Sequence, residues 1–253
     1  MQETANLARM FQYVIDVCKF NAKIFTDDDL DLLLRRAVAI CKGTTHESDM
    51  RNCITLFDTI ITYVHIPTKS LRSCLEILCE IHKRITDLQD HAWNTLTHLF
   101  KSHVGQAAIS ALLHILLDGP TQQMLEGPER ERGRRFSLYR GTTQVLQLLL
   151  FENGRNGLPK VPMSLLFPAL RASIKEPHHT QEEIVISLID TVLSQESMRD
   201  LLLAETDFGE LLEIIHTCAQ RDNDRYRARR TSASNDAATS KIDELSCNGV
   251  YAF

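Results

Sequence analysis

The stretch from Leu71 to Ile85 constrains the fold most, because its apolar residues follow the spacing of one face of an α-helix. These residues are Leu71, Cys74, Leu75, Leu78, Ile81 and Ile85. A polar row of Arg72, Glu76, Glu80 and Lys83 occupies the other face. A helix with one apolar face must bury that face against neighbours, so this segment predicts a set of packed helices.

Similar amphipathic segments precede and follow this helix, with short breaks and no strand pattern between them. The predicted helix pairs span residues 3–42, 48–85, 88–118, 136–174 and 181–220. The first three pairs begin at intervals of about forty to forty-five residues, which is the period of HEAT and armadillo repeats. Short connections make consecutive helices antiparallel, and stacked pairs bury a continuous seam. The sequence therefore predicts an all-α fold, a right-handed α-solenoid of antiparallel helix pairs over residues 1–220.

The segments outside these pairs are predicted from their composition. Residues 119–135 and 153–160 are rich in charged and turn residues and are predicted to be loops. Residues 221–253 form a polar tail without hydrophobic periodicity and are predicted to be largely irregular. Thr26, followed by Asp27, Asp28 and Asp29, is typical of a helix N-cap.

The composition narrows the class of protein. Hydrophobic residues make up 43% of the 253 positions, which suffices for a large core, and the net charge of −5 argues against a general nucleic-acid surface. Six of the seven cysteines lie in apolar helical patterns, which is typical of reduced, buried thiols in a cytosolic protein. The longest apolar run, Ala107 to Leu117, is too short to span a bilayer, and Met1 to Ala8 lack a signal-peptide pattern.

No motif in the sequence predicts catalysis: it has no glycine-rich phosphate loop, nucleophile elbow or metalloprotease helix. Cys74, Cys79 and His82 are the best metal candidates, but Cys74 is offset and a fourth ligand is missing. We therefore interpret them as core cysteines beside a surface histidine and expect no metal or cofactor. His178-His179 is interpreted as an exposed loop, and Trp93 as a core residue.

Two basic segments place arginines ahead of a hydroxyl, a pattern that basophilic kinases recognise. They are Arg134-Arg135-Phe136-Ser137 and Arg227-Ala228-Arg229-Arg230-Thr231-Ser232. Ser137 and Ser232 are therefore candidate phosphorylation sites, although a solvated loop without modification explains the pattern as well.

A second candidate site is a polar surface for a protein partner. It consists of Arg35, Arg36, Arg72, Glu76, Glu80 and Lys83. The second helices of solenoid repeats often line the face where partners bind. A plain solvated face is the alternative interpretation.

Several short segments, in this order, resemble the N-terminal region of the tuberin family. They are Cys18-Lys19-Phe20-Asn21, the helix around Cys74 to Cys79, Trp93 with Leu96 and Phe100, Ser102-His103-Val104-Gly105-Gln106-Ala107-Ala108-Ile109, and Leu138-Tyr139-Arg140-Gly141. The resemblance covers residues 10–150 and is faint beyond Leu158. Residues 121–135 depart from the vertebrate pattern, which favours a distant, fungal member.

The resemblance implies a function for the chain. Tuberin is the GTPase-activating subunit of a complex with hamartin; it acts on the small GTPase Rheb and restrains TOR signalling. Its activating domain lies near the C-terminus, works through an asparagine, and has no counterpart in this sequence. The resemblance therefore implies a non-enzymatic scaffold that binds the hamartin coiled coil and reaches Rheb only through that other domain. It implies a cytoplasmic protein, peripheral at the lysosome or vacuole surface as part of the complex.

Two other functions are compatible with the same helical pattern. An unrelated helical-repeat adaptor, such as a transport or trafficking module, would share the fold but would not bind hamartin. A self-contained all-helical enzyme would need a pocket with convergent polar groups whose pKa values are perturbed.

Overall fold

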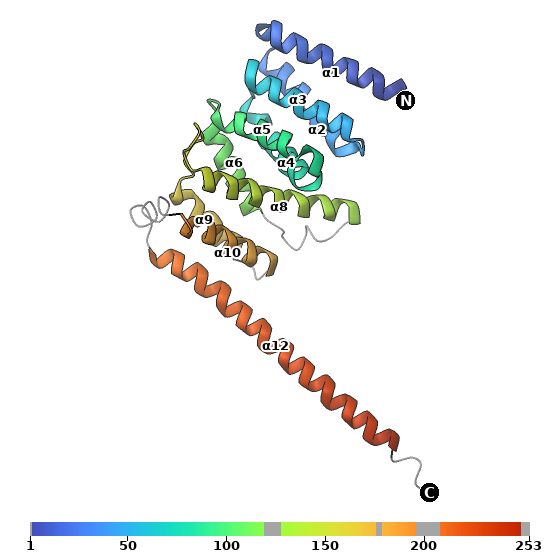
Figure 1. The fold of residues 1–253 in the computed structure, drawn as a ribbon, viewed down its shortest axis with the longest axis vertical. Coiled ribbons are helices and arrows are strands. Elements are labelled where there is room, and N and C mark those ends of the chain that lie inside the picture. The colour runs from blue at the N-terminus through green and yellow to red at the C-terminus, as the bar shows by residue number, and fades with distance from the viewer. Residues whose placement is uncertain (1, 119–127, 176–178, 196–207, 249–253) are drawn as a thin grey trace.

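The computed structural model describes residues 2–118, 128–175, 179–195 and 208–248, and the regular elements in these ranges are all helices (Figure 1). The α-helices are α1 (Gln2–Phe20), α2 (Asp27–Gly43), α3 (Glu47–Tyr63), α4 (Thr68–Arg84), α5 (Gln89–Lys101), α6 (Gly105–Leu117), α8 (Glu129–Glu152), α9 (Met163–Ser173), α10 (His179–Leu193) and α12 (Phe208–Asn248). Two short 3₁₀ helices, η1 (Ala22–Ile24) and η2 (Thr86–Leu88), lie in the connections.

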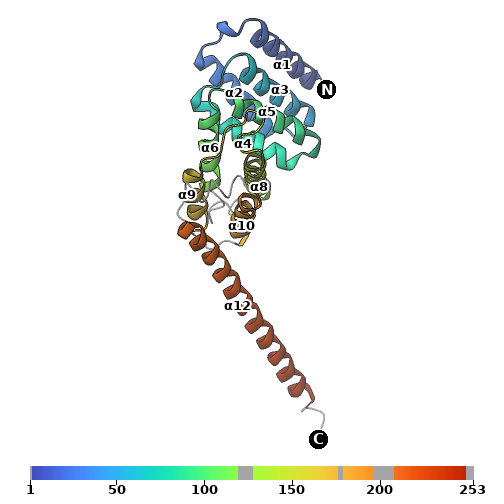
Figure 2. The same ribbon diagram turned by 60° about the vertical axis from the view of Figure 1, so that its left-hand side comes forward.

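The helices stack in serial order, from α1 at one end to α12 at the other (Figures 1 and 2). Helices two positions apart in the numbering pack against each other: α1 against α3, α3 against α5, α2 against α4 and α8 against α10. Each helix thus covers the apolar face of neighbours close to it in the sequence. The predicted all-α solenoid is confirmed.

Two layers run along the array. One consists of α2, α4, α8 and α10, and the other contains α1, α3, α5, α6 and α9. Figure 2 shows α8 and α10 on one side of the array and α6 and α9 on the other.

The packing of these helices differs from the predicted helix pairs. Among the described helices, α1 and α2, α3 and α4, and α8 and α9 are not closely packed; instead α2 packs on α3, α4 on α5 and α6 on α9. Helices α5 and α6 both lie in the second layer. In the first layer, α4 therefore packs directly on α8. This α4–α8 contact is the most extensive one between helices in the described chain.

The core follows the predicted apolar faces. On α4, Cys74, Leu75, Leu78 and Ile81 are buried, as the spacing predicts, and so is Ile77. Full burial of each such side chain contributes about 1.5–3 kcal/mol relative to exposure. The six cysteines expected to be buried thiols are all buried and free. No helix in the described part of the chain is long and apolar enough to cross a membrane.

The helix α8 begins at Glu129, earlier than predicted, so residues 129–135 of the expected loop 119–135 are helical. Residues 119–127 of that expected loop lie outside the described residues. Pro128 is its N-cap, and Glu129 and Glu131 in its first turn complement the helix dipole. Arg135 pairs with Glu131 one turn earlier, with their charged atoms 3.5 Å apart. Charges that suggested a loop therefore support the first turns of a helix. The other expected loop, 153–160, is non-helical.

The expected irregular tail is also different, because α12 continues as one helix to Asn248 and projects away from the array (Figure 1). Its N-terminal half is fixed to α10, where Arg221 and Arg225 both pair with the buried carboxylate of Glu182. The segment 221–248 contains neither glycine nor proline, the two residues that disfavour a helix most. Of its described side chains, those of residues 222–224 and 226–230 are exposed.

Candidate interaction surface

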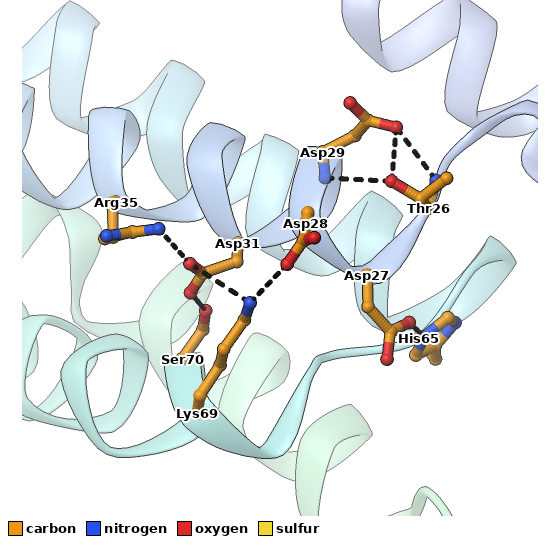
Figure 3. A network of polar contacts seen from close by, with 9 residues as sticks. All are labelled: Thr26, Asp27, Asp28, Asp29, Asp31, Arg35, His65, Lys69 and Ser70. Carbon is orange, nitrogen blue, oxygen red and sulfur yellow. Dashed lines mark hydrogen bonds and ion pairs between the residues drawn. The ribbon is translucent and has the colours of Figure 1, made fainter.

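The candidate partner surface lies on the layer formed by α2, α4 and α8. At one edge of it, polar side chains join the N-terminal turns of α2 and α4 (Figure 3). The hydroxyl of Thr26 accepts from the backbone N–H of Asp29 at 3.2 Å, and the Asp29 carboxylate accepts from the backbone N–H of Thr26 at 3.0 Å. This reciprocal capping box confirms Thr26 as the N-cap of α2.

Asp31 is the centre of this polar network (Figure 3). Its carboxylate is buried, accepts from the Ser70 hydroxyl at 2.5 Å, and pairs with Arg35 and with the Lys69 ammonium at 3.6 Å. The hydrogen bond from Ser70, followed by the charges of Arg35 and Lys69, holds the pKa of Asp31 below its ordinary value. Lys69 also donates to Asp28 at 2.7 Å. These contacts fix α2 on α4 with groups that are all charged or polar.

The structure separates the two predicted arginines of α2. Arg35 pairs with Asp31 while most of its own side chain stays in solvent. Arg36 is exposed, and it forms no ion pair with another described residue. Arg36 is therefore the freer of the two for a partner.

On α4, the predicted row is only partly exposed. Arg72 donates to Glu76 at 3.0 Å and also pairs with Asp118, the C-cap residue of α6. It therefore ties the start of α4 to the end of α6, besides facing solvent. Lys83 is exposed and, within the described chain, has no ion-pair partner.

Glu80 does not belong to an open surface, which corrects the predicted row. Its side chain is only 7% exposed and accepts from Arg84 at 2.8 Å and from two nitrogens of Arg134 at 2.8 and 3.0 Å. Arg134 comes from α8 and also donates to the backbone carbonyl of Lys42 at the end of α2, at 3.1 Å. One guanidinium therefore joins three helices. The hydrogen bonds to Glu80 raise the pKa of Arg134, so it stays charged.

A shallow hollow of about 350 Å³ lies beside this cluster. It is lined by Lys42, Glu76, Ile77, Glu80, Glu131, Arg134, Arg135 and Leu138. Charged groups of both signs rim a small apolar floor of Ile77 and Leu138. Such a surface fits a protein partner with mixed charges and has no convergent set of catalytic groups.

Ser137 lies inside α8, where its hydroxyl donates to the Gly133 carbonyl at 2.9 Å. A kinase would need this turn of helix to open, and it would also need Arg134, which is held by Glu80. Ser232 lies within α12, but its side chain is outside the described part of the structure. Phosphorylation of Ser137 and of Ser232 remains a prediction.

Cys74, Cys79 and His82 are all buried, so His82 is not the surface residue that the sequence indicated. Burial lowers the pKa of His82, whose Nδ1 lies 3.2 Å from the carbonyl oxygen of Gln89. Among the described residues, no three His, Cys, Asp or Glu side chains are grouped to hold a metal ion. His178 lies outside the described residues, and His179 pairs with Glu183 at 3.2 Å. Trp93 is half-buried and packs against the core, 6.5 Å from the ring of His82.

Sequence reasoning missed the residues that fix this surface. The sequence placed Arg134 only in a kinase motif and did not single out Asp31. The sequence does contain a signal for the ion pair of Asp31 with Arg35, because Asp31 lies four residues before Arg35 and this spacing favours ion pairs on a helix. The contact between Arg134 and Glu80 had no local signal, since 54 positions separate the two residues.

Comparison with known proteins gives a consistent result. The family described as "Domain of unknown function (DUF3384)" matches residues 1–248. A solved structure described as "Structure of the TSC2 N-terminus" superposes with a TM-score of 0.73 at 30% sequence identity. The match covers 87% of this chain and 53% of that chain, so the present sequence spans about half the length of the solved one. TSC2 is tuberin, and DUF3384 is a family of tuberin N-terminal domains.

Proposed function

The chain belongs to the family of tuberin N-terminal domains, and we propose that it is the scaffold through which a tuberin-like GTPase-activating protein binds the hamartin coiled coil. In the full-length protein this scaffold would support GTPase activation on Rheb and negative regulation of TOR signalling. The chain itself would perform no chemistry. The complex would be cytoplasmic and peripheral at the lysosome or vacuole surface.

The observation that carries the proposal is the mixed-charge face of α2, α4 and α8. Arg36 on α2 and Lys83 on α4 are exposed without ion-pair partners among the described residues. The hollow lined by Glu76 and Arg135 lies between α4 and α8 of the same layer. A coiled coil presents alternating acidic and basic side chains beside its apolar seam. The internal ion pairs of Glu80 and Asp31 keep the helices beneath this face in fixed relative positions. A preorganised face loses little entropy when a long partner helix binds.

The test is the affinity of the purified chain for the hamartin coiled coil, measured by isothermal titration calorimetry. The double variant Arg36→Glu, Lys83→Glu removes no ion pair of the described chain, so it should fold normally. We expect it to bind about tenfold more weakly, because charge mismatches at an interface typically cost more than 1 kcal/mol.

The matched control is Lys101→Glu with Arg155→Glu, which reverses two exposed positive charges away from α2 and α4. This control should bind like the wild-type chain. Normal binding by the first double variant would show that the partner uses another face. Failure of the folded wild-type chain to bind at all would favour the unrelated adaptor function.

A further inference from the structure

Helix α1 carries two apolar stripes, and only one of them is buried. Phe11, Ile15 and Cys18 are 0–3% exposed and belong to the core, and α1 packs on α3. The second stripe, which we call the α1 outer stripe, consists of Met10, Tyr13, Val17 and Phe20. Met10 is 51% exposed, Tyr13 72% and Phe20 86%.

The α1 outer stripe lies at one end of the array, on the terminal helix (Figure 1). Just beyond it, Ile24 of η1 is also exposed, at 61%. Three large apolar side chains exposed in one row with the half-buried Val17 are typical of an interaction surface.

The spacing of the stripe indicates the shape of its partner. Met10, Tyr13, Val17 and Phe20 are separated by three, four and three residues. That alternation is the apolar seam of a coiled coil, in which side chains of one helix insert between those of a second helix. An amphipathic helix with anchors at the same spacing is therefore the complementary shape.

The charges beside the stripe indicate the chemistry of its partner. The polar residues that immediately precede the stripe positions and Ile24 are Arg9, Gln12, Asp16, Lys19 and Lys23. Three are cations and one is an anion, and the carboxylate of Asp16 already accepts from the amide of Gln12 at 2.9 Å. A second copy of this chain would place the same positive flank opposite this one. An acidic helix would bring opposite charges instead.

We propose that the α1 outer stripe binds an acidic amphipathic helix of a partner protein, whose apolar residues pack on Tyr13 and Phe20 and whose carboxylates pair with Arg9, Lys19 and Lys23. This surface is distinct from the α2–α4–α8 face, and the proposal does not depend on hamartin binding.

The test uses the complete chain and two fluorescein-labelled designed helices of four heptads. Both helices carry Ile and Leu on the apolar seam; one has Glu at the flanking positions and the other has Lys. Like charges keep each helix from pairing with itself at neutral pH. By fluorescence anisotropy at low salt, the Glu helix should bind at least about tenfold more tightly than the Lys helix, and added salt should reduce the difference.

Variants locate the binding. Tyr13→Ser and Phe20→Ser should each weaken binding of the Glu helix about tenfold, since each removes a large apolar contact. Phe151→Ser is the matched control, because Phe151 is a 58% exposed aromatic residue on α8. It should bind the Glu helix normally. Circular dichroism should show that all three variants fold, since the replaced side chains are exposed.

Four results would overturn the proposal, and two of them would identify another occupant of the stripe. Equal binding of the two helices, or normal binding by Phe20→Ser, would contradict it directly. A wild-type dimer in light scattering that Phe20→Ser converts to a monomer would assign the stripe to a second copy. Co-sedimentation with phosphatidylserine vesicles that Phe20→Ser abolishes would assign it to a membrane surface.

Discussion

A Cβ atom placed on Gly141 of α8 would lie 1.9 Å from the backbone carbonyl oxygen of Cys79 on α4. It would also lie 3.3 Å from the Cβ of Lys83. The first distance is far below any normal contact, so α8 approaches α4 this closely only because residue 141 has no side chain. The most extensive helix–helix contact of the described chain therefore depends on one glycine.

Gly141→Ala should destabilise the protein. The added methyl group must push α8 away from the rigid backbone of α4, and overpacking of this kind costs about 1–3 kcal/mol or more. We expect the free energy of unfolding to fall by at least about 2 kcal/mol, and the melting temperature by several degrees. Urea titration and thermal melting followed by circular dichroism measure both quantities.

Gly133→Ala is the control for this prediction, because it lies on the same helix and its Cβ would meet no atom within 4 Å. Alanine stabilises a helix relative to glycine by up to about 1 kcal/mol, so this variant should be as stable as the wild type or more stable. Equal losses of stability in the two variants would show that the close approach at Gly141 is not the cause.

Arg134→Met should also destabilise the protein, through the contact with Glu80. The substitution keeps an apolar side chain but leaves the buried carboxylate with Arg84 alone, and we expect a loss of about 1–3 kcal/mol. Hydrogen exchange of the amides in the first turns of α8 should become faster. Arg51→Met is the control: its pair with Glu47 on α3 is exposed, so its loss should cost less than about 0.5 kcal/mol. Exchange rates that match in the two variants would rule out a clamp at Arg134.

The parts of the fold predicted correctly are those determined by local signals. The apolar spacing of α4 and the cap at Thr26 depend on residues within a few positions of each other. The predictions for the start of α8 and for the segment 221–248 of α12 were wrong, because dense charge occurs both in loops and on solvated helices. In α8, Arg134 joins a carboxylate that is distant in sequence. In α12, Arg221 and Arg225 join Glu182 of α10.

The candidate surface was predicted only in part for the same reason. The row from Arg72 to Lys83 was read from a single helix, which indicates which residues share a face but not what covers it. Glu80 lies on that face, yet α8 covers it with Arg134. The α1 outer stripe shows the opposite case: Met10 fits the apolar pattern of a core residue, but no described helix covers it.

The pKa of Asp31 should depend on Ser70. The hydrogen bond from Ser70 is the largest cause that keeps this pKa below its ordinary value of about 3.9. A carboxylate whose pKa is lower in the folded state contributes stability above the unfolded pKa, and this contribution is lost as the pH falls through the folded pKa. Asp31→Asn should therefore flatten the loss of stability below about pH 4, in urea titrations at several pH values.

Carbon-13 NMR titration of the Asp31 carboxyl group tests the cause directly. Ser70→Ala should raise its pKa toward the ordinary value. Ser137→Ala, which removes a hydroxyl that donates to the carbonyl of Gly133, should leave it unchanged. A pKa of Asp31 that is identical in the wild type and in Ser70→Ala would assign the shift to Arg35 and Lys69 instead.

The thiols of the native protein should resist modification. Burial raises the pKa of Cys74 and of Cys79 to about 12, and the thiolate is the reactive form. Dithiobis(nitrobenzoic acid) at pH 8 should therefore not react with the native protein, and should react with six thiols per chain in urea. Cys247 is replaced by serine in the test protein, because its side chain lies outside the described part of the structure. Rapid labelling of Cys74 or Cys79 in the native state, mapped by mass spectrometry, would show that α4 is not held between α2 and α8 as described.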